Sequence, residues 1–76
     1  MNDKKLLLEL SVQDIIKYIV EETEITIKEA MVSFYQSEIF EKLQAYETGL
    51  YRESPAYVYE LYKDEKKFGK IVQLEV

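Results

Sequence analysis

Helix-start signals at three points along the chain constrain its fold more than any other feature. The strongest is Ser54-Pro55, because serine caps the free N–H groups of a first helical turn and proline suits the first helical position. The segment "ITIKEA" holds a capping box, in which Thr26 and Glu29 can each accept the other's backbone N–H. Ser37 is placed to cap a further short helix. We therefore expect a helix directly after each of these caps.

The segment before Thr26 carries a fourth helix pattern. Its apolar positions that share one helical face are Leu8, Val12, Ile15, Ile16 and Ile19. Within it, "LSVQDI" puts Ser11 at an N-cap position, which leaves the preceding residues open to two interpretations. Either the helix reaches back to residue 4, or "KLLLEL" is a short strand paired with "KIVQLEV" at residues 70–76. We expect the helix, because two short strands are marginal alone.

Helix ends follow from charge and from glycine. The acidic run "EETE" disfavours helix beyond residue 22, and Gly49 and Gly69 can take the left-handed conformation that stops a helix. We expect helices over about residues 4–22, 27–36, 38–46 and 55–67. The sequence thus predicts an all-α fold, a compact bundle of about four short helices in one domain over residues 1–76, with residues 70–76 as a short strand or an extended tail.

Apolar spacing also predicts which side chains reach the core. In the second helix we expect Ile27, Ala30, Met31, Phe34 and Tyr35 to face inward. In the later helices the expected inward residues are Ile39, Phe40, Leu43, Val58, Leu61 and Tyr62. On the first helix, the side opposite the apolar stripe holds Leu6, Leu7 and Leu10, which could pair two copies of the chain.

Tyrosine is dense in "TGLYRESPAYVYEL", residues 48–61, in a chain without histidine, cysteine or tryptophan. The pattern fits half-buried packing, with Tyr57 and Tyr59 flanking a buried helix face and keeping their hydroxyls in water. It also fits a binding surface, since tyrosine and arginine are enriched at interface cores. On that second interpretation the candidate partner-binding residues are Tyr51, Arg52, Tyr57 and Tyr59.

The composition argues against an enzyme. Without histidine, the usual general base near neutral pH is missing, so the serines have no base to activate them. The chain lacks cysteine, its two glycines stand apart, and no metal-ligand spacing appears. The many carboxylates fall on solvated helix faces or helix ends. We expect no catalytic residue, no cofactor and no metal.

The charge balance narrows the class of partner. Fifteen acidic and ten basic residues give a net charge of −5, which disfavours phosphate binding and suits a basic protein partner. A helix-turn-helix reading of residues 26–46 would put Glu38 and Glu41 in a phosphate-lined groove. A small regulator that contacts nucleic acid, directly or through a partner, is the alternative. The cysteine-free, Lys/Glu-rich composition suits the cytoplasm, and no apolar run is long enough for a membrane span.

The run "ITIKEAMVSFYQSEIFEKL", followed by "ETGLYRESPAYVYELYKDE", resembles a family of small helical proteins of unassigned function from Gram-positive and gut bacteria. The shared pattern lies within residues 12–65 and comprises Glu29-Ala30, Phe34-Tyr35-Gln36-Ser37, Leu43 and Thr48 through Leu61. The sequence departs from it at Leu50-Tyr51, where many relatives carry Leu-His. Some relatives are suspected antitoxins or accessory partners of toxins that resemble ADP-ribosyltransferases. The resemblance implies a non-enzymatic protein-interaction domain and assigns no catalytic or ligand residue.

Overall fold

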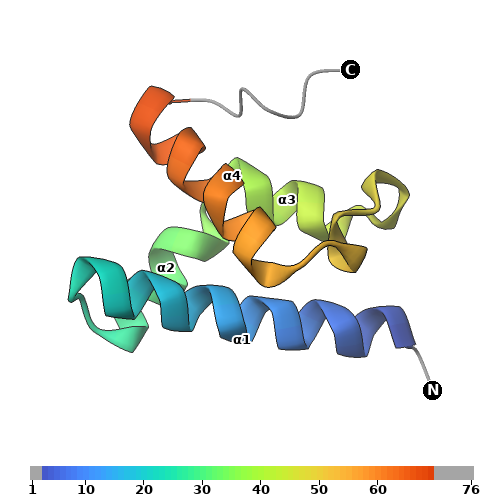
Figure 1. Ribbon diagram of the computed structural model, residues 1–76, viewed down its shortest axis with the longest axis horizontal. Helices are drawn as coiled ribbons and strands as arrows, with labels where there is room; N and C mark the ends of the chain where they lie inside the picture. Colours follow the sequence, from blue (N-terminus) through green and yellow to red (C-terminus); the bar gives the residue numbers. More distant parts are fainter. Residues whose placement is uncertain (1–2, 70–76) are drawn as a thin grey trace.

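The computed structural model describes residues 3–69, which form four α-helices and two short 3₁₀ turns (Figure 1). The predicted all-α bundle is confirmed, and the predicted tail over residues 70–76 lies outside the described residues. In chain order the elements are α1 (Asp3–Thr23), α2 (Ile27–Tyr35), α3 (Glu38–Gln44), η1 (Tyr46–Thr48), η2 (Leu50–Arg52) and α4 (Pro55–Phe68).

The three caps predicted from the sequence begin α2, α3 and α4. Thr26 Oγ1 accepts the Glu29 N–H at 3.1 Å, and Glu29 Oε1 accepts the Thr26 N–H at 3.0 Å, so the capping box is complete. Ser37 Oγ accepts the backbone N–H of Phe40 at 3.1 Å. Ser54 Oγ accepts that of Tyr57 at 3.2 Å. Each cap satisfies a backbone donor that the first turn of a helix leaves unpaired.

α1 begins at Asp3 and continues without interruption through Ser11, so the helix was the correct choice over a terminal strand. The N-cap position predicted for Ser11 is wrong. Ser11 is a buried residue in the middle of the helix, one turn beyond Leu7. The first turns of α1 remain helical because Leu8 packs against the core, and tertiary packing stabilises helix more than local signals do.

α3 ends at Gln44, and Gly49 does not terminate it as the sequence predicted. The Thr48 hydroxyl lies 2.7 Å from the carbonyl oxygen of Lys42 and 2.9 Å from that of Ala45, and it shares its one hydrogen between them at the end of the helix. Gly49 is left-handed, with φ +75°, but it joins η1 to η2. The chain therefore turns twice before α4 begins.

A single apolar core lies between α1 and the later elements. Phe34 has no exposed surface, and its ring contacts those of Phe40 and Tyr62 with centroids 5.3 and 5.6 Å apart. In the α1 stripe predicted from spacing, Val12, Ile15, Ile16 and Ile19 are buried and Leu8 is partly buried. In the later helices Ile39, Leu43, Val58, Leu61 and Tyr62 are buried and Phe40 is partly buried. The core prediction is confirmed for α1, α3 and α4.

α4 is bonded to each of the three earlier helices by a different side chain. The Tyr59 hydroxyl donates to Glu22 Oε1 of α1 at 3.1 Å. The Tyr62 hydroxyl shares a hydrogen bond of 2.6 Å with Ser33 of α2. The Glu65 carboxylate accepts the backbone N–H groups of Glu38 and Ile39, at 2.8 and 2.9 Å, at the start of α3. Figure 1 shows α1 along one edge of the molecule, with α3 and α4 on one side of it.

The core prediction was wrong for three of the five α2 residues expected to face inward. Ala30 and Phe34 are fully buried, but Ile27, Met31 and Tyr35 are 64%, 37% and 44% exposed. These three residues follow one another at four-residue spacing and form a stripe beside the buried one. The helix turns only one of its two apolar stripes toward the core, so the second one meets solvent.

Candidate interaction surface

An apolar groove runs between α1 and α2. We call it the α1–α2 groove. It consists of two hollows, of about 540 and 640 Å³, that share Val12, Gln13 and Tyr35. The apolar side chains that line it are Leu8, Val12, Ile16 and Val20 from α1, Ile27, Met31 and Tyr35 from α2, and Phe40 from α3.

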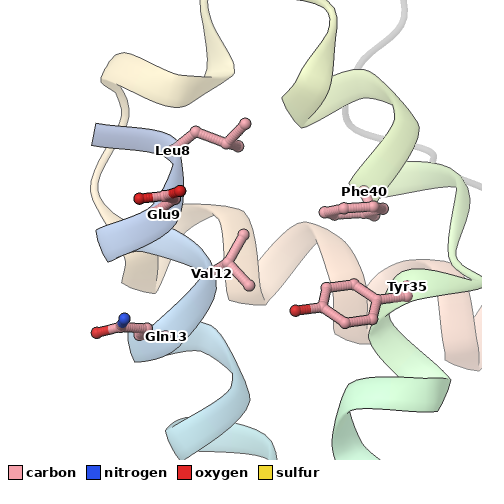
Figure 2. A pocket seen from close by; sticks show the side chains of 6 residues that line it. All are labelled: Leu8, Glu9, Val12, Gln13, Tyr35 and Phe40. Atoms are coloured by element: carbon pink, nitrogen blue, oxygen red, sulfur yellow. The ribbon is translucent and has the colours of Figure 1, made fainter. Parts of the chain in front are cut away.

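At one end of the groove, two aromatic rings form the wall opposite α1. Figure 2 shows Tyr35 and Phe40 pointing across the gap toward α1, with Leu8 and Val12 facing them. The two ring centroids lie 4.9 Å apart, so the rings form one continuous wall. The Tyr35 hydroxyl is directed at α1 in this view, and it gives the apolar wall one hydrogen-bonding group.

The polar residues of the groove are all on α1. Glu9, Gln13, Lys17 and Glu21 border the α1 wall, whereas the α2 wall presents only Ile27, Met31 and the ring of Tyr35. A contiguous exposed apolar strip with a polar rim is typical of a protein-binding site. Methionine suits such a site because its unbranched side chain adapts to different neighbours. The groove is the strongest candidate for a binding surface among the described residues.

The four tyrosine and arginine residues predicted to bind a partner do not share one surface. Tyr51 and Tyr59 are buried, at 5% and 4% exposure, whereas Arg52 and Tyr57 are exposed. The prediction that the Tyr59 hydroxyl stays in water is wrong, because the hydroxyl donates a hydrogen bond to Glu22 of α1. Both side chains belong to the core, and Tyr51 also lines a small hollow at the surface. Binding through Tyr51, Arg52, Tyr57 and Tyr59 stays a prediction.

η2 brings Tyr51 and Arg52 together. Arg52 Nε donates to the Tyr51 hydroxyl at 2.9 Å, and the Tyr51 ring contacts that of Tyr46 with centroids 5.3 Å apart. Both residues line a smaller hollow, of about 400 Å³, whose opposite wall includes Leu7 and Leu10 of α1. Tyr57 does not line this hollow. Packing explains Tyr51, and the arginine secures its hydroxyl.

Tyr59 lies in an ordered cluster between α1 and α4. Burial, followed by the hydrogen bond to Glu22, raises the pKa of Tyr59 from 10.0 to about 12. The Tyr18 ring packs against it with centroids 5.5 Å apart, and Lys63 Nζ lies 4.9 Å from the ring centroid. These contacts make Tyr59 a neutral packing and hydrogen-bonding residue at neutral pH.

Two other groups with shifted pKa values, Glu29 and Lys63, also have hydrogen-bond partners within the fold. The backbone N–H of Thr26 lowers the pKa of Glu29, as a capping box requires. The hydrogen bond to Glu60 raises the pKa of Lys63. Among residues 3–69, no group of three or more Asp, Glu, His or Cys could hold a metal ion. In the same part of the chain, no helix has the length and apolar character to cross a membrane.

Sequence reasoning assigned the α2 wall of the groove to the core, although the sequence held a signal against that. Six of the nine α2 residues are apolar or aromatic, namely Ile27, Ala30, Met31, Val32, Phe34 and Tyr35. Such a set covers more of the helix circumference than one contact with a core can bury. The excess predicts an exposed apolar side, but not which side it is.

A comparison of the chain with protein-family models, curated proteins and solved structures found no match.

Proposed function

We propose that this chain is a non-enzymatic protein-interaction domain that binds an apolar helix of a partner protein in the α1–α2 groove. One observation carries the proposal: α2 presents Ile27, Met31 and Tyr35 to solvent directly beside the apolar wall of α1. Removing such side chains from water supplies the affinity, and the groove between two helices is a recurrent docking site for an amphipathic helix.

The spacing of the walls specifies the shape of the ligand. Val12, Ile16 and Val20 repeat every four residues, as do the three residues of the α2 wall, so each wall is a ridge with a step of about 6 Å. A ligand helix packs its own ridges mainly on the exposed α2 wall, because Val12 and Ile16 are only 9% and 8% exposed. The ridge from Val12 to Val20 is about 12 Å long, so the ligand helix needs apolar residues over two to three turns.

The charge and the family resemblance support a class of partner. A net charge of −5 favours encounter with a basic protein. The resemblance supports an antitoxin-like role in the cytoplasm, in which the ligand helix belongs to a toxin-like enzyme. We propose this role as the narrower form of the function.

The test replaces one residue of the α2 wall, and in a separate variant its exposed neighbour, by glutamate. Met31→Glu places a carboxylate in the groove, and Val32→Glu places one next to it on α2, at a residue that is 50% exposed and does not line the groove. A partner captured from the native lysate is purified and titrated calorimetrically against both variants. We expect Met31→Glu to weaken binding at least tenfold, about 1.4 kcal/mol, and Val32→Glu to leave it unchanged.

Three results would count against this assignment. Equal affinity of Met31→Glu and the unaltered chain places the site elsewhere. Loss of binding in Arg52→Ala or Tyr57→Ala, with Met31→Glu unaffected, moves it to the exposed residues predicted from the sequence. Binding of a labelled nucleic acid duplex that falls steeply with salt supports the nucleic-acid regulator instead.

A further inference from the structure

We infer that the outer face of α1 pairs two copies of this chain in an antiparallel dimer. This face holds Leu6, Leu7 and Leu10, which are 47%, 45% and 49% exposed. They lie on the first three turns of α1, the helix that runs along one edge of the molecule in Figure 1. The three leucines do not line the α1–α2 groove, so the inference does not depend on the proposed function. Lys17, which the pairing also uses, borders the groove.

Two charged residues extend the leucine face in both directions along α1. Asp3, Leu10 and Lys17 are spaced seven residues apart, and such residues drift by only about 20° per heptad around a helix. All three are exposed. They form one line about 21 Å long, with an anion at one end, a leucine in the middle and a cation at the other end.

This line is complementary to itself when it is turned around. A two-fold axis through Leu10 places the leucine against its counterpart and brings Asp3 of each copy opposite Lys17 of the other. Leu6 and Leu7 precede Leu10 by one turn, so the axis brings one such pair to each side of the central leucines, where they meet Gln13 and Asp14 of the other copy. A parallel pair would instead place like charges together at Asp3, Asp14 and Lys17. The charges therefore select a second copy in the antiparallel orientation, and the closed two-fold limits the assembly to a dimer.

Both charges are available for this pairing. The ion pairs within the described part of the chain join Lys63 to Glu22 and to Glu60, and neither Asp3 nor Lys17 belongs to them. The leucines supply the affinity through burial of apolar surface, and the charges fix the register.

Charge exchange gives the sharpest test, because it separates pairing from any effect of a single charge. We expect sedimentation equilibrium of the full chain to show a monomer–dimer equilibrium. Asp3→Lys alone and Lys17→Glu alone should each raise the dissociation constant at least tenfold. The double variant Asp3→Lys/Lys17→Glu should restore it, since the pairs are then reformed with exchanged signs. Leu10→Glu should give a monomer, and far-UV circular dichroism checks that each variant is folded.

The controls distinguish this face from the groove. Lys28→Glu reverses an exposed charge on α2 and should leave the dimer unchanged, as should Met31→Glu. A chain that stays monomeric up to about 1 mM overturns the inference. So does a dimer that survives Leu10→Glu, or a double charge variant that fails to recover. A dimer lost in Met31→Glu and kept in Leu10→Glu would assign self-association to the groove.

Discussion

At the scale of the residue, the Tyr59 hydroxyl makes stability depend on alkaline pH. Its pKa is about 12 in the folded protein and near the ordinary 10.0 when unfolded. Between these values the unfolded chain loses the proton that the folded protein retains, so the free energy of unfolding falls as pH rises from about 10 to 12. Below pH 10 the full contribution is present. Urea unfolding at a series of alkaline pH values measures this slope.

Tyr59→Phe should remove that part of the slope, and it should also cost about 1 kcal/mol at neutral pH through the lost hydrogen bond to Glu22. Tyr57→Phe is the matched control, because Tyr57 lies on the same helix and is exposed. It should keep both the slope and the stability of the unaltered chain. Identical alkaline slopes for Tyr59→Phe and the unaltered chain would show that the hydroxyl does not hold its proton.

The sequence alone could not separate the buried tyrosines from the exposed ones. Tyr57 and Tyr59 both border the apolar face of α4, and their local patterns are equivalent. Their difference arises from α1, which brings Glu22 to Tyr59 from a distant part of the sequence. Tyr51 is buried for a similar reason, since η2 turns its ring against Tyr46. The partner-binding residues predicted from residue type therefore include both core residues and surface residues.

At the scale of the element, α3 depends on a carboxylate from another helix. Glu65 accepts two N–H groups at the start of α3, in addition to the cap from Ser37. Glu65→Ala should lower the free energy of unfolding by about 1–2 kcal/mol, because those donors lose their acceptor. Glu60→Ala is the control on the same helix. It removes only a surface ion pair with Lys63 and should cost well under 1 kcal/mol in urea unfolding.

Equal losses for the two variants would mean that the Glu65 bonds do not stabilise α3 beyond an ordinary surface contact.

The starts of α2, α3 and α4 were predictable from sequence, whereas the N-cap signal at Ser11 was wrong, and one helix end and one helix face were not predicted. Thr26, Ser37 and Ser54 cap their helices through residues three positions away, so the whole interaction lies within a short segment. The end of α3 depends on the Thr48 hydroxyl, which returns to it from η1. The groove-facing stripe of α2 is exposed because of where the other helices lie. The spacing of apolar residues within α2 does not predict those positions.

At the scale of the whole molecule, a chain this small has a limited core, and pairing through α1 should contribute to its stability. Only the folded chain presents the leucine face, so dimer formation shifts the unfolding equilibrium by mass action. We expect Tm to rise by roughly 3–6 °C for each tenfold increase in protein concentration above the dissociation constant. Leu10→Glu should unfold at a Tm independent of concentration. Calorimetric scans at several concentrations make the comparison.

A concentration-independent Tm in a chain that sediments as a dimer would mean that the dimer survives until after the helices unfold.

The bonding of α4 to all three earlier helices also determines when the domain can form during translation. A ribosome synthesises α1, α2 and α3 before α4. Until then Glu22 lacks Tyr59, Ser33 lacks Tyr62, and the first turn of α3 lacks Glu65. The nascent chain exposes its apolar stripes throughout that interval. The bundle of α1 to α4 is completed only after α4 has emerged, so the chain without α4 is the form in which a chaperone would meet it.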